Sequence, residues 1–437
     1  MGKFQAYTNY ADSGLDWLGS LPSGWMTERA KLVFREVNDR SEDGMEQLLS
    51  VSEYYGVKPR SEVIEEGEYL SRAESLEGYK KCQVNDLVMN IMLAWKRGLA
   101  FSRFSGIVSP AYSVFRLTKP YDPWYLNYLL RTDIYTGLFK RWSTGVIDSR
   151  LRLYPDVFGA LPIVVPPPSE QSAIAAFLDH ETAKIDRLIA KQERLIGLLK
   201  EKRQAVISHA VTKGLNPDAP MKDSGVEWLG KVPAHWVVAR VKNVFRNLDF
   251  RRIPVSAEER SKRTGEYPYY GASGIIDTID DYLFDEDLVL VGEDGANLVL
   301  RSTPLAFVAR GKYWVNNHAH ILKPIDDLVD YWAEVVELVD VTPLVVGSAQ
   351  PKLTAEALGN LRIVYAPDYS ERLAIQKHLN EQRVKFQTLM DKATKAVALL
   401  KEHRTALISA AVTGKIDVRG WQKPNTEPEE AAEAASA

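Results

Sequence analysis

Basic and amide side chains gather around turn-rich phrases in two separate stretches of the sequence, which is the pattern expected of residues that contact nucleic acid. One stretch holds Lys96, Arg97 and Arg103 and ends in the phrase STGVIDSRLRL at 143–153. The other begins at Arg251 and ends in the phrase GSAQPKLT at 347–354. Arginine and lysine can neutralise phosphates or read guanine edges, and asparagine and glutamine can read adenine.

Each basic residue taken alone is better explained as a solvated surface charge, so the prediction rests on the grouping. The phrases at 143–153 and 347–354 are favoured because each lies shortly before a predicted long helix in its own half of the chain. The residues that we predict to contact DNA are Lys96, Arg97, Arg103, Ser143, Thr144, Arg150, Arg251, Arg252, Tyr270, Asn317, Gln350 and Lys352.

Two histidines in the phrase VNNHAHIL at 315–322 suggest a metal site. His318 and His320 lie two positions apart without a nearby cysteine or carboxylate pattern, which is poor spacing for zinc. A strand whose alternating polar side chains support the surrounding fold explains them better, with DNA contact as the second explanation. The sequence also lacks the GxGxxG fingerprint, the Walker loop and the Asn-Pro-Pro-Tyr phrase of adenine methyltransferases. We therefore predict no catalytic residue, metal or cofactor in this chain.

An internal repeat organises the sequence. The segment DSGLDWLGSLPSGW at 12–25 returns as DSGVEWLGKVPAHW at 223–236, and the 169–214 segment is echoed from residue 370 onward. The chain is therefore two copies of one unit, each with a Trp motif, a variable region and a long helix. The tryptophans of the motif could stack on bases, but their place in the repeated scaffold favours core or docking roles.

The long helices are predicted from a seven-residue apolar lattice. In the first copy Leu178 and Ile185 lie on this lattice, with Leu188 and Leu195 at companion positions, and the second copy repeats the lattice from Leu379. Prolines at 166–168 precede the first helix, and Gly214 and Gly414 are predicted to end the two helices. A pseudo-two-fold axis between the copies would make the helices an antiparallel coiled coil. The alternative is that each helix packs only on its own domain.

The regions 26–160 and 237–360 contain short β-rich runs separated by turn residues, which indicates an α+β fold. A formal net charge of -3 excludes a polycation that coats nucleic acid by bulk charge, so any DNA affinity must come from local clusters. A single cysteine, Cys82, fits a reducing compartment, and neither a signal peptide nor a membrane-length apolar run is present. We expect a cytoplasmic protein.

Several phrases resemble those of type I restriction-modification specificity subunits. They include GIVSPAYSVFRL at 106–117, YPYYGASGIID at 267–277 and PPPSEQSAIAAFLD at 166–179, together with the phrases and repeats quoted above. The resemblance implies two target-recognition domains joined by two long conserved helices. The implied domains are a first recognition domain at 1–160, a central helical spacer at 161–222, a second recognition domain at 223–361, a C-terminal helical spacer at 362–420 and a disordered tail at 421–437.

The resemblance also implies what the protein does. Each recognition domain would read one half of an asymmetric bipartite target in double-stranded DNA, with the helices fixing the distance between the halves. Two copies of a modification methyltransferase and the restriction or motor subunits would be the partners, and S-adenosylmethionine, ATP and Mg would bind to those partners. The alternative is a coiled-coil interaction scaffold without sequence-specific DNA binding.

Overall fold

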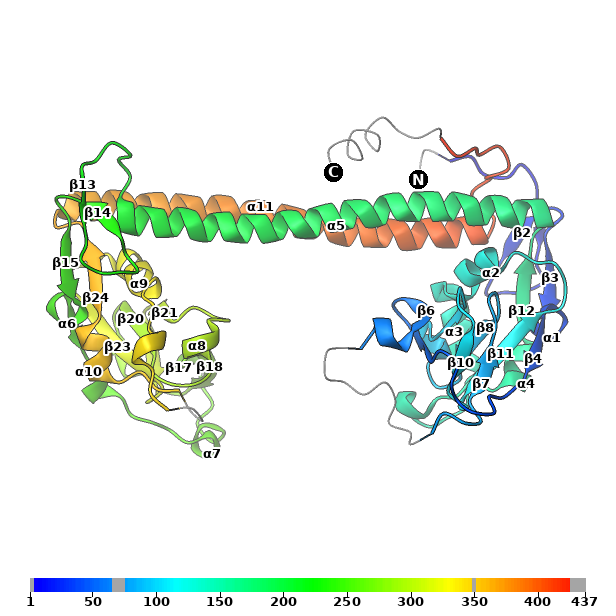
Figure 1. Ribbon diagram of the computed structural model, residues 1–437, viewed down its shortest axis with the longest axis horizontal. Coiled ribbons are helices and arrows are strands. Elements are labelled where there is room, and N and C mark those ends of the chain that lie inside the picture. The colour runs from blue at the N-terminus through cyan, green and yellow to red at the C-terminus, as the bar shows by residue number, and fades with distance from the viewer. Residues whose placement is uncertain (1–3, 65–74, 348–350, 425–437) are drawn as a thin grey trace. The chain divides into compact units, whose positions relative to one another are not determined.

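The computed structural model describes residues 4–64, 75–347 and 351–424. The chain divides into two compact units, of which one comprises residues 1–192 and 395–437 and the other residues 193–394. Each unit therefore contains one recognition region and a segment of each long helix. The predicted domains treat the helices as separate spacers, whereas the contacts assign half of each helix to each unit. Figure 1 shows the elements of both units.

The first unit is built on a four-stranded antiparallel sheet in the order β4-β11-β8-β9. Strand β8 is buried along its whole length, which explains its unbroken apolar run LVM. The elements of this unit are β3 (Met26–Arg29), α1 (Ala30–Val33), β4 (Phe34–Val37), β5 (Leu49–Ser52), β6 (Gly56–Pro59), η1 (Arg60–Glu62), β7 (Lys80–Cys82), β8 (Leu87–Asn90), η2 (Ala94–Lys96), β9 (Leu99–Phe101), β10 (Gly106–Val108), β11 (Tyr112–Leu117), α2 (Pro123–Leu130), α3 (Asp133–Trp142), η3 (Asp148–Arg150), α4 (Pro155–Ala160) and β12 (Pro162–Val165).

The second unit repeats this sheet in the order β16-β23-β20-β21 and adds a second sheet in the order β18-β17-β22-β19. Its elements are β15 (Val237–Arg240), α6 (Val241–Val244), β16 (Phe245–Asn247), η4 (Asp249–Arg251), α7 (Ala257–Arg260), β17 (Tyr267–Gly271), β18 (Gly274–Ile279), β19 (Phe284–Asp285), β20 (Leu288–Gly292), α8 (Asn297–Leu300), β21 (Ala306–Ala309), β22 (Lys312–Val315), β23 (Ala319–Pro324), α9 (Val329–Glu337), η5 (Thr342–Leu344), α10 (Ala355–Asn360) and β24 (Arg362–Tyr365). The α+β prediction is confirmed.

The repeated Trp motif folds as a hairpin in both units. It is β1 (Tyr10–Asp12) with β2 (Ser20–Pro22) in the first unit, and β13 (Met221–Asp223) with β14 (Lys231–Pro233) in the second. The indole Nε1 of Trp25 donates to Glu170, and that of Trp236 donates to Glu371, both at 2.9 Å. These buried tryptophans thus fasten each hairpin to the first turn of a long helix, as the scaffold interpretation predicts.

The two long helices are α5 (Pro168–Lys213) and α11 (Tyr369–Val412). Helix α5 ends directly before Gly214, and α11 ends two residues before Gly414; the φ angles of 76° and 73° at these positions suit glycine because a β-carbon would be strained there. The predicted helix ends are therefore confirmed, whereas α5 begins at Pro168, the last of the prolines that were predicted to precede it. Leu188 and Leu195, however, are each 42% exposed, because a two-helix seam covers only a narrow stripe of each helix.

Within each unit the helix segments run antiparallel. In the first unit Arg404 of α11 forms an ion pair with Asp186 of α5, while Trp421, beyond the end of α11, packs on Phe177 near the start of α5. In the second unit the start of α11 lies beside the end of α5, because Trp236 contacts both Glu371 and Gly214. The antiparallel prediction is thus confirmed. The tail at 421–437 was predicted to be disordered, but its first residue, Trp421, packs on Phe177. Residues 425–437 lie outside the described residues.

In each unit a buried tyrosine contacts the chain shortly before a long helix begins. Tyr125 on α2 donates its hydroxyl to the carbonyl of Val164 at the end of β12, and Tyr331 on α9 accepts from the N–H of Ala366 just after β24.

Among the described residues, no helix is both long and apolar enough to cross a membrane.

Candidate nucleic-acid interface

A closed loop stands on the surface of the first unit where the sequence predicts DNA contacts. Thr144 and Arg152 exchange two backbone hydrogen bonds of 2.9 and 3.0 Å, which close the base of the loop. The side chains of Thr144 and Arg150 are exposed, whereas Ser143 ends α3 and donates its hydroxyl to the carbonyl of Phe139. The loop therefore presents a hydroxyl and a guanidinium to solvent on a fixed base.

The second unit carries a corresponding loop. Val346 and Lys352 exchange two backbone hydrogen bonds of 3.0 and 2.8 Å. In both units the next residue is a buried leucine, Leu153 or Leu353. Its N–H donates to the backbone carbonyl of the residue that follows a central strand of the sheet, which is Ile91 after β8 or Glu293 after β20. Lys352 is exposed and its ammonium group lies 3.0 Å from Glu293. Gln350, which we predict to contact DNA, lies outside the described residues.

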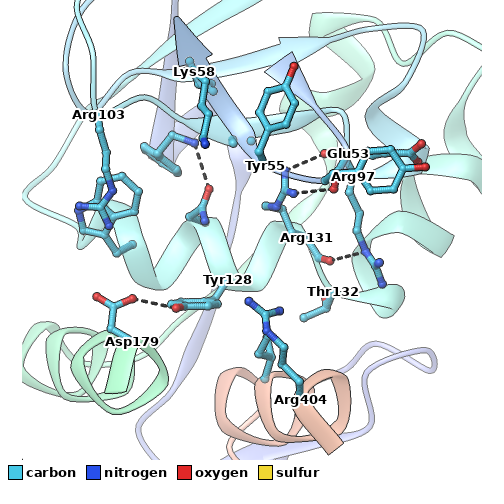
Figure 2. A pocket seen from close by; sticks show the side chains of 18 of the residues that line it. Glu53, Tyr55, Lys58, Arg97, Arg103, Tyr128, Arg131, Thr132, Asp179 and Arg404 are labelled. Carbon is cyan, nitrogen blue, oxygen red and sulfur yellow. Dashed lines mark hydrogen bonds between the residues drawn. The ribbon is translucent and has the colours of Figure 1, made fainter. Parts of the chain in front are cut away.

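A basic cavity of about 720 Å³ lies in the first unit between β6, α2 and the two long helices. Figure 2 shows Arg131 near its centre, with Arg97 beside it and Arg404 reaching in from α11. The Arg131 guanidinium donates to the carbonyl oxygens of Arg97, Leu99 and Glu53, each at 2.8 Å. Burial, and then the charges of Arg97 and Arg404, lower the pKa of Arg131 to about 10.

Two of the predicted contacts line this cavity and one lies on the surface nearby. Arg97 adopts a positive φ of 63°, donates its Nε to the carbonyl of Arg131 and pairs with Asp133. Arg103 is exposed and stacks on Trp124, with its guanidinium carbon 3.6 Å from the ring centroid. Lys96 is exposed and extends over a neighbouring indole.

Sequence reasoning missed Arg131 and Arg404. Arg131 follows α2 and is surrounded in sequence by ordinary helix residues, and Arg404 belongs to the repeated helix phrase rather than to a recognition region. They meet only because α11 packs beside α2 in the folded first unit. Nothing in their local sequence signals this proximity.

A buried charge cluster occupies the second unit around Arg252. This side chain is only 16% exposed; it pairs with Glu293 and donates to the carbonyl of Ala319 at 2.9 Å, and its Nη2 lies 3.6 Å from Asp249. The charge of Arg252 is therefore balanced by largely buried carboxylates, and its side chain stabilises the fold beneath the surface.

His320 joins the same cluster through both ring nitrogens. Nδ1 lies 2.6 Å from a carboxylate oxygen of Asp249, and Nε2 lies 2.8 Å from the carbonyl oxygen of Leu353. Burial alone would raise the pKa of Asp249, but the hydrogen bond and charge of His320 outweigh it, so the pKa lies below its usual value. Burial would also raise the pKa of Glu293, but the hydrogen bonds from Arg252 and Lys352 outweigh burial, so this pKa is lowered as well.

Asp249, Glu293 and His320 together offer three donor atoms within 4.8 Å of one another. Sequence reasoning could not see this group, because 71 residues separate Asp249 from His320. Arg252 and Lys352 already pair with Glu293, however, so cations of the chain itself balance the carboxylates. A metal ion would have to displace a guanidinium from a largely buried site.

The remaining predicted contacts of the second unit differ in exposure. Arg251 is exposed and pairs with Glu286 at 3.2 Å, and Asn317 is exposed in the turn before β23. Tyr270 is only 9% exposed, because its ring packs on Phe307 and Tyr313. Tyr270 therefore belongs to the core beneath the surface.

Comparisons with known proteins agree with this geometry. Residues 233–402 match the family described as the type I restriction modification DNA specificity domain. A type I restriction enzyme specificity subunit of Haemophilus influenzae is 30% identical over 149 residues, which is 34% of this chain and 35% of the relative. The EcoKI specificity subunit of Escherichia coli is 26% identical over 154 residues, 35% of this chain and 28% of the relative. The matched segments thus span about a third of the length of these relatives.

Solved structures match over almost the whole chain. A structure from a study of complex assembly and conformational transition of the type I R-M system has a TM-score of 0.68 at 15% identity, covering 91% of this chain and 99% of that one. The HsdS subunit from Thermoanaerobacter tengcongensis has a TM-score of 0.51 at 15% identity, covering 91% and 98%. The fold of both units and their long helices is shared with these structures. Residues 233–402 are therefore similar to the type I restriction modification DNA specificity domain, and the chain as a whole shares the fold of these solved structures.

Proposed function

We propose that this chain is the DNA-reading subunit of a type I restriction-modification complex and that it recognises an asymmetric bipartite target. The observation that carries the proposal is the pair of closed loops at 144–152 and 346–352. Each loop stands on the four-stranded sheet of its own unit, and both are closed by an equivalent pair of backbone hydrogen bonds, yet their side chains differ. One scaffold with two different surfaces is what two unlike half-sites require.

In the first unit the proposed contacts are the exposed residues of the loop and of the basic surface near it. In the second unit they are exposed residues around the corresponding loop and the turn before β23. The full set is Lys96, Arg97, Arg103, Thr144, Arg150, Arg251, Asn317, Lys352 and Gln350, of which Gln350 lies outside the described residues. Ser143 places the first loop, and Arg252 and Tyr270 support the second surface.

The long helices are proposed to set the spacing of the half-sites and to carry the partner subunits. A target read from one face of a duplex needs half-site centres about one helical turn, roughly 34–36 Å, apart, or a multiple of that. Because the scaffold is duplicated, two copies of the methyltransferase are expected. Methyl transfer with S-adenosylmethionine, and ATP- and Mg-dependent cleavage, are assigned to the partners, and the complex is expected in the cytoplasm.

Methylome sequencing tests the proposal. A host expressing this chain with its cognate adenine methyltransferase is compared with a host expressing the methyltransferase alone. A split adenine-methylated motif that requires this chain supports the proposal. If the complex assembles but no chain-dependent motif is found, the chain is a coiled-coil scaffold without sequence-specific DNA binding.

A further inference from the structure

The basic cavity of the first unit has an unbalanced charge. Among the described residues, six basic and two acidic side chains line it. One of the two carboxylates, Asp179, accepts a hydrogen bond from Tyr128 at 2.8 Å. Arg97 and Arg404 each pair with a carboxylate outside the lining, Asp133 and Asp186, whose side chains are 69% and 52% exposed. Exposed pairs of this kind contribute little binding energy, so both arginines can exchange these partners for a stronger anion.

Arg131 carries the buried positive charge that is least balanced by the groups around it. None of the described carboxylates pairs with its guanidinium, which is held by backbone carbonyl oxygens instead. Carbonyl dipoles satisfy its donors without cancelling its charge, and Arg97 and Arg404 repel it. A buried charge is costly when it is not paired. The chain itself therefore leaves a positive potential at the centre of a cavity of ligand size.

The corresponding place in the second unit is neutral. Glu337 ends α9 where Arg131 follows α2, and each offers its backbone carbonyl to an arginine of positive φ, Arg301 at 50° and Arg97 at 63°. The side chain of Glu337 accepts from the N–H of Ala306 at the start of β21, and Arg131 donates to the carbonyl of Leu99 at the start of β9, both at 2.8 Å.

Further pairs complete the neutralisation in the second unit. Glu337 pairs with Arg301 at 3.3 Å, and Arg383 of α11 pairs with Glu334 and with Asp330. In the first unit the place of the Glu334 and Arg383 pair is taken by the uncharged contact of Tyr128 with Thr182. The excess positive charge is therefore a property of the first unit and not of the shared scaffold.

We infer that this cavity binds a phosphate group, held between Arg97, Arg131 and Arg404. Guanidinium groups bind phosphate through paired, charge-assisted hydrogen bonds, and the ring of Tyr55 in the cavity wall suits an adjoining nucleoside. The phosphate can come from a free nucleotide or from the DNA backbone. The second source rests on the proposed function, whereas the first does not.

The test uses the full-length chain and three variants. Arg404→Gln removes an arginine on the exposed side of α11, where it is 37% exposed, without touching the core. Arg203→Gln changes the repeat-equivalent arginine of α5, in the second unit, and serves as the matched control. Asp186→Asn removes the partner of Arg404 but keeps the cation, and so separates loss of the ion pair from loss of the anion site.

Calorimetric titration with inorganic pyrophosphate and with ADP probes the free source, and anisotropy of labelled duplexes probes the backbone source. Arg404→Gln is expected to weaken binding of the phosphate source by about tenfold or more, since a hydrogen bond to a charged group contributes about that factor. The Arg203→Gln and Asp186→Asn variants are expected to keep wild-type affinity. If DNA is the source, the loss is equal for target and random duplexes, because a phosphate contact carries no sequence information.

The outcomes separate this inference from the proposed function. Loss of pyrophosphate or ADP binding in Arg404→Gln identifies a free phosphate ligand, and an equal loss for all duplexes identifies the backbone. If Arg404→Gln binds pyrophosphate, ADP and duplexes as tightly as the wild-type chain does, the inference is overturned, even where the methylome still shows a chain-dependent motif.

Discussion

The two units of this chain share a backbone and differ in charge at one matched position. Arg131 and Glu337 both reach the first residue of an edge strand, but one donates to its carbonyl and the other accepts from its N–H. Burial raises the pKa of Glu337 and lowers that of Arg131, so burial disfavours the charged form of the side chain in both units, although the two charges have opposite signs. Duplication thus conserved the framework while the side chains that decide what each unit binds diverged.

The largest expected effect follows from changing the helices that both units share. Inserting one heptad into α5 and a matching heptad into α11 adds about 10 Å, which corresponds to roughly three base pairs. We expect methylome sequencing to show a spacer longer by that amount or a complete loss of methylation. A seven-residue insertion in the loop at 215–219 is the control and should leave the motif as it is. Unchanged spacing in the helix variant would refute the proposal that the helices set it.

Exchanging the matched charges should destabilise each unit separately. Arg131→Glu would bury a carboxylate against three carbonyl oxygens in the first unit, and Glu337→Arg would face Arg301 in the second. Each is expected to lower the free energy of unfolding by about 3–5 kcal/mol, the typical effect of leaving a buried charge unpaired.

Hydrogen exchange measured by mass spectrometry can locate this effect. Protection should fall in β9 for Arg131→Glu and in β21 for Glu337→Arg, with the other unit unchanged. Equal loss in both units, or none in either, would show that the two positions are not matched parts of separate cores.

Acidification should weaken the second unit through the cluster around Arg252. The pKa values of Asp249 and Glu293 are lowered in the folded chain, so their stabilising effect is present above the ordinary carboxyl pKa of about 4 and is lost as the pH falls through the lower folded values. Protection of β20 and β23 should therefore decline as the pH drops below about 4.

The variant Arg252→Gln provides the contrast, because it removes a cation that lowers the pKa of Glu293. In this variant the hydrogen-exchange protection of β20 and β23 should be lower at neutral pH than in the wild-type chain, and it should depend less on pH. An identical pH dependence in the two proteins would show that the cluster does not stabilise the fold in this way.

The smallest expected effect concerns the feature that the units have in common. Trp25→Phe and Trp236→Phe each remove one indole hydrogen bond of 2.9 Å to a glutamate that keeps a second partner, Tyr7 or His235. Each substitution should lower the free energy of unfolding by about 1 kcal/mol, measured by urea denaturation. A strongly unequal pair of values would argue against equivalent scaffold roles.

The framework could be predicted from the sequence because its signals are local. A seven-residue lattice, the prolines before residue 169 and the glycines at 214 and 414 specify the two helices, and the repeated tryptophans specify their anchors. The exposure of Leu188 and Leu195 was not predictable from the lattice, because it depends on how much of the helix surface the partner covers.

The site could be predicted only in part because it depends on tertiary contacts. The loops around Arg150 and Lys352 were found from matching phrases near the helices. Arg252 and Tyr270 have the same residue types as surface contacts, and only their packing shows that they lie beneath the surface. Arg131 and Arg404 are 273 positions apart and meet only in the folded unit.

The methylated motif of a host that expresses the chain with its methyltransferase shows whether two unlike units read two unlike half-sites. We predict two different half-sites separated by a fixed stretch of unspecified bases. A palindromic motif, or a single continuous one, would contradict the account.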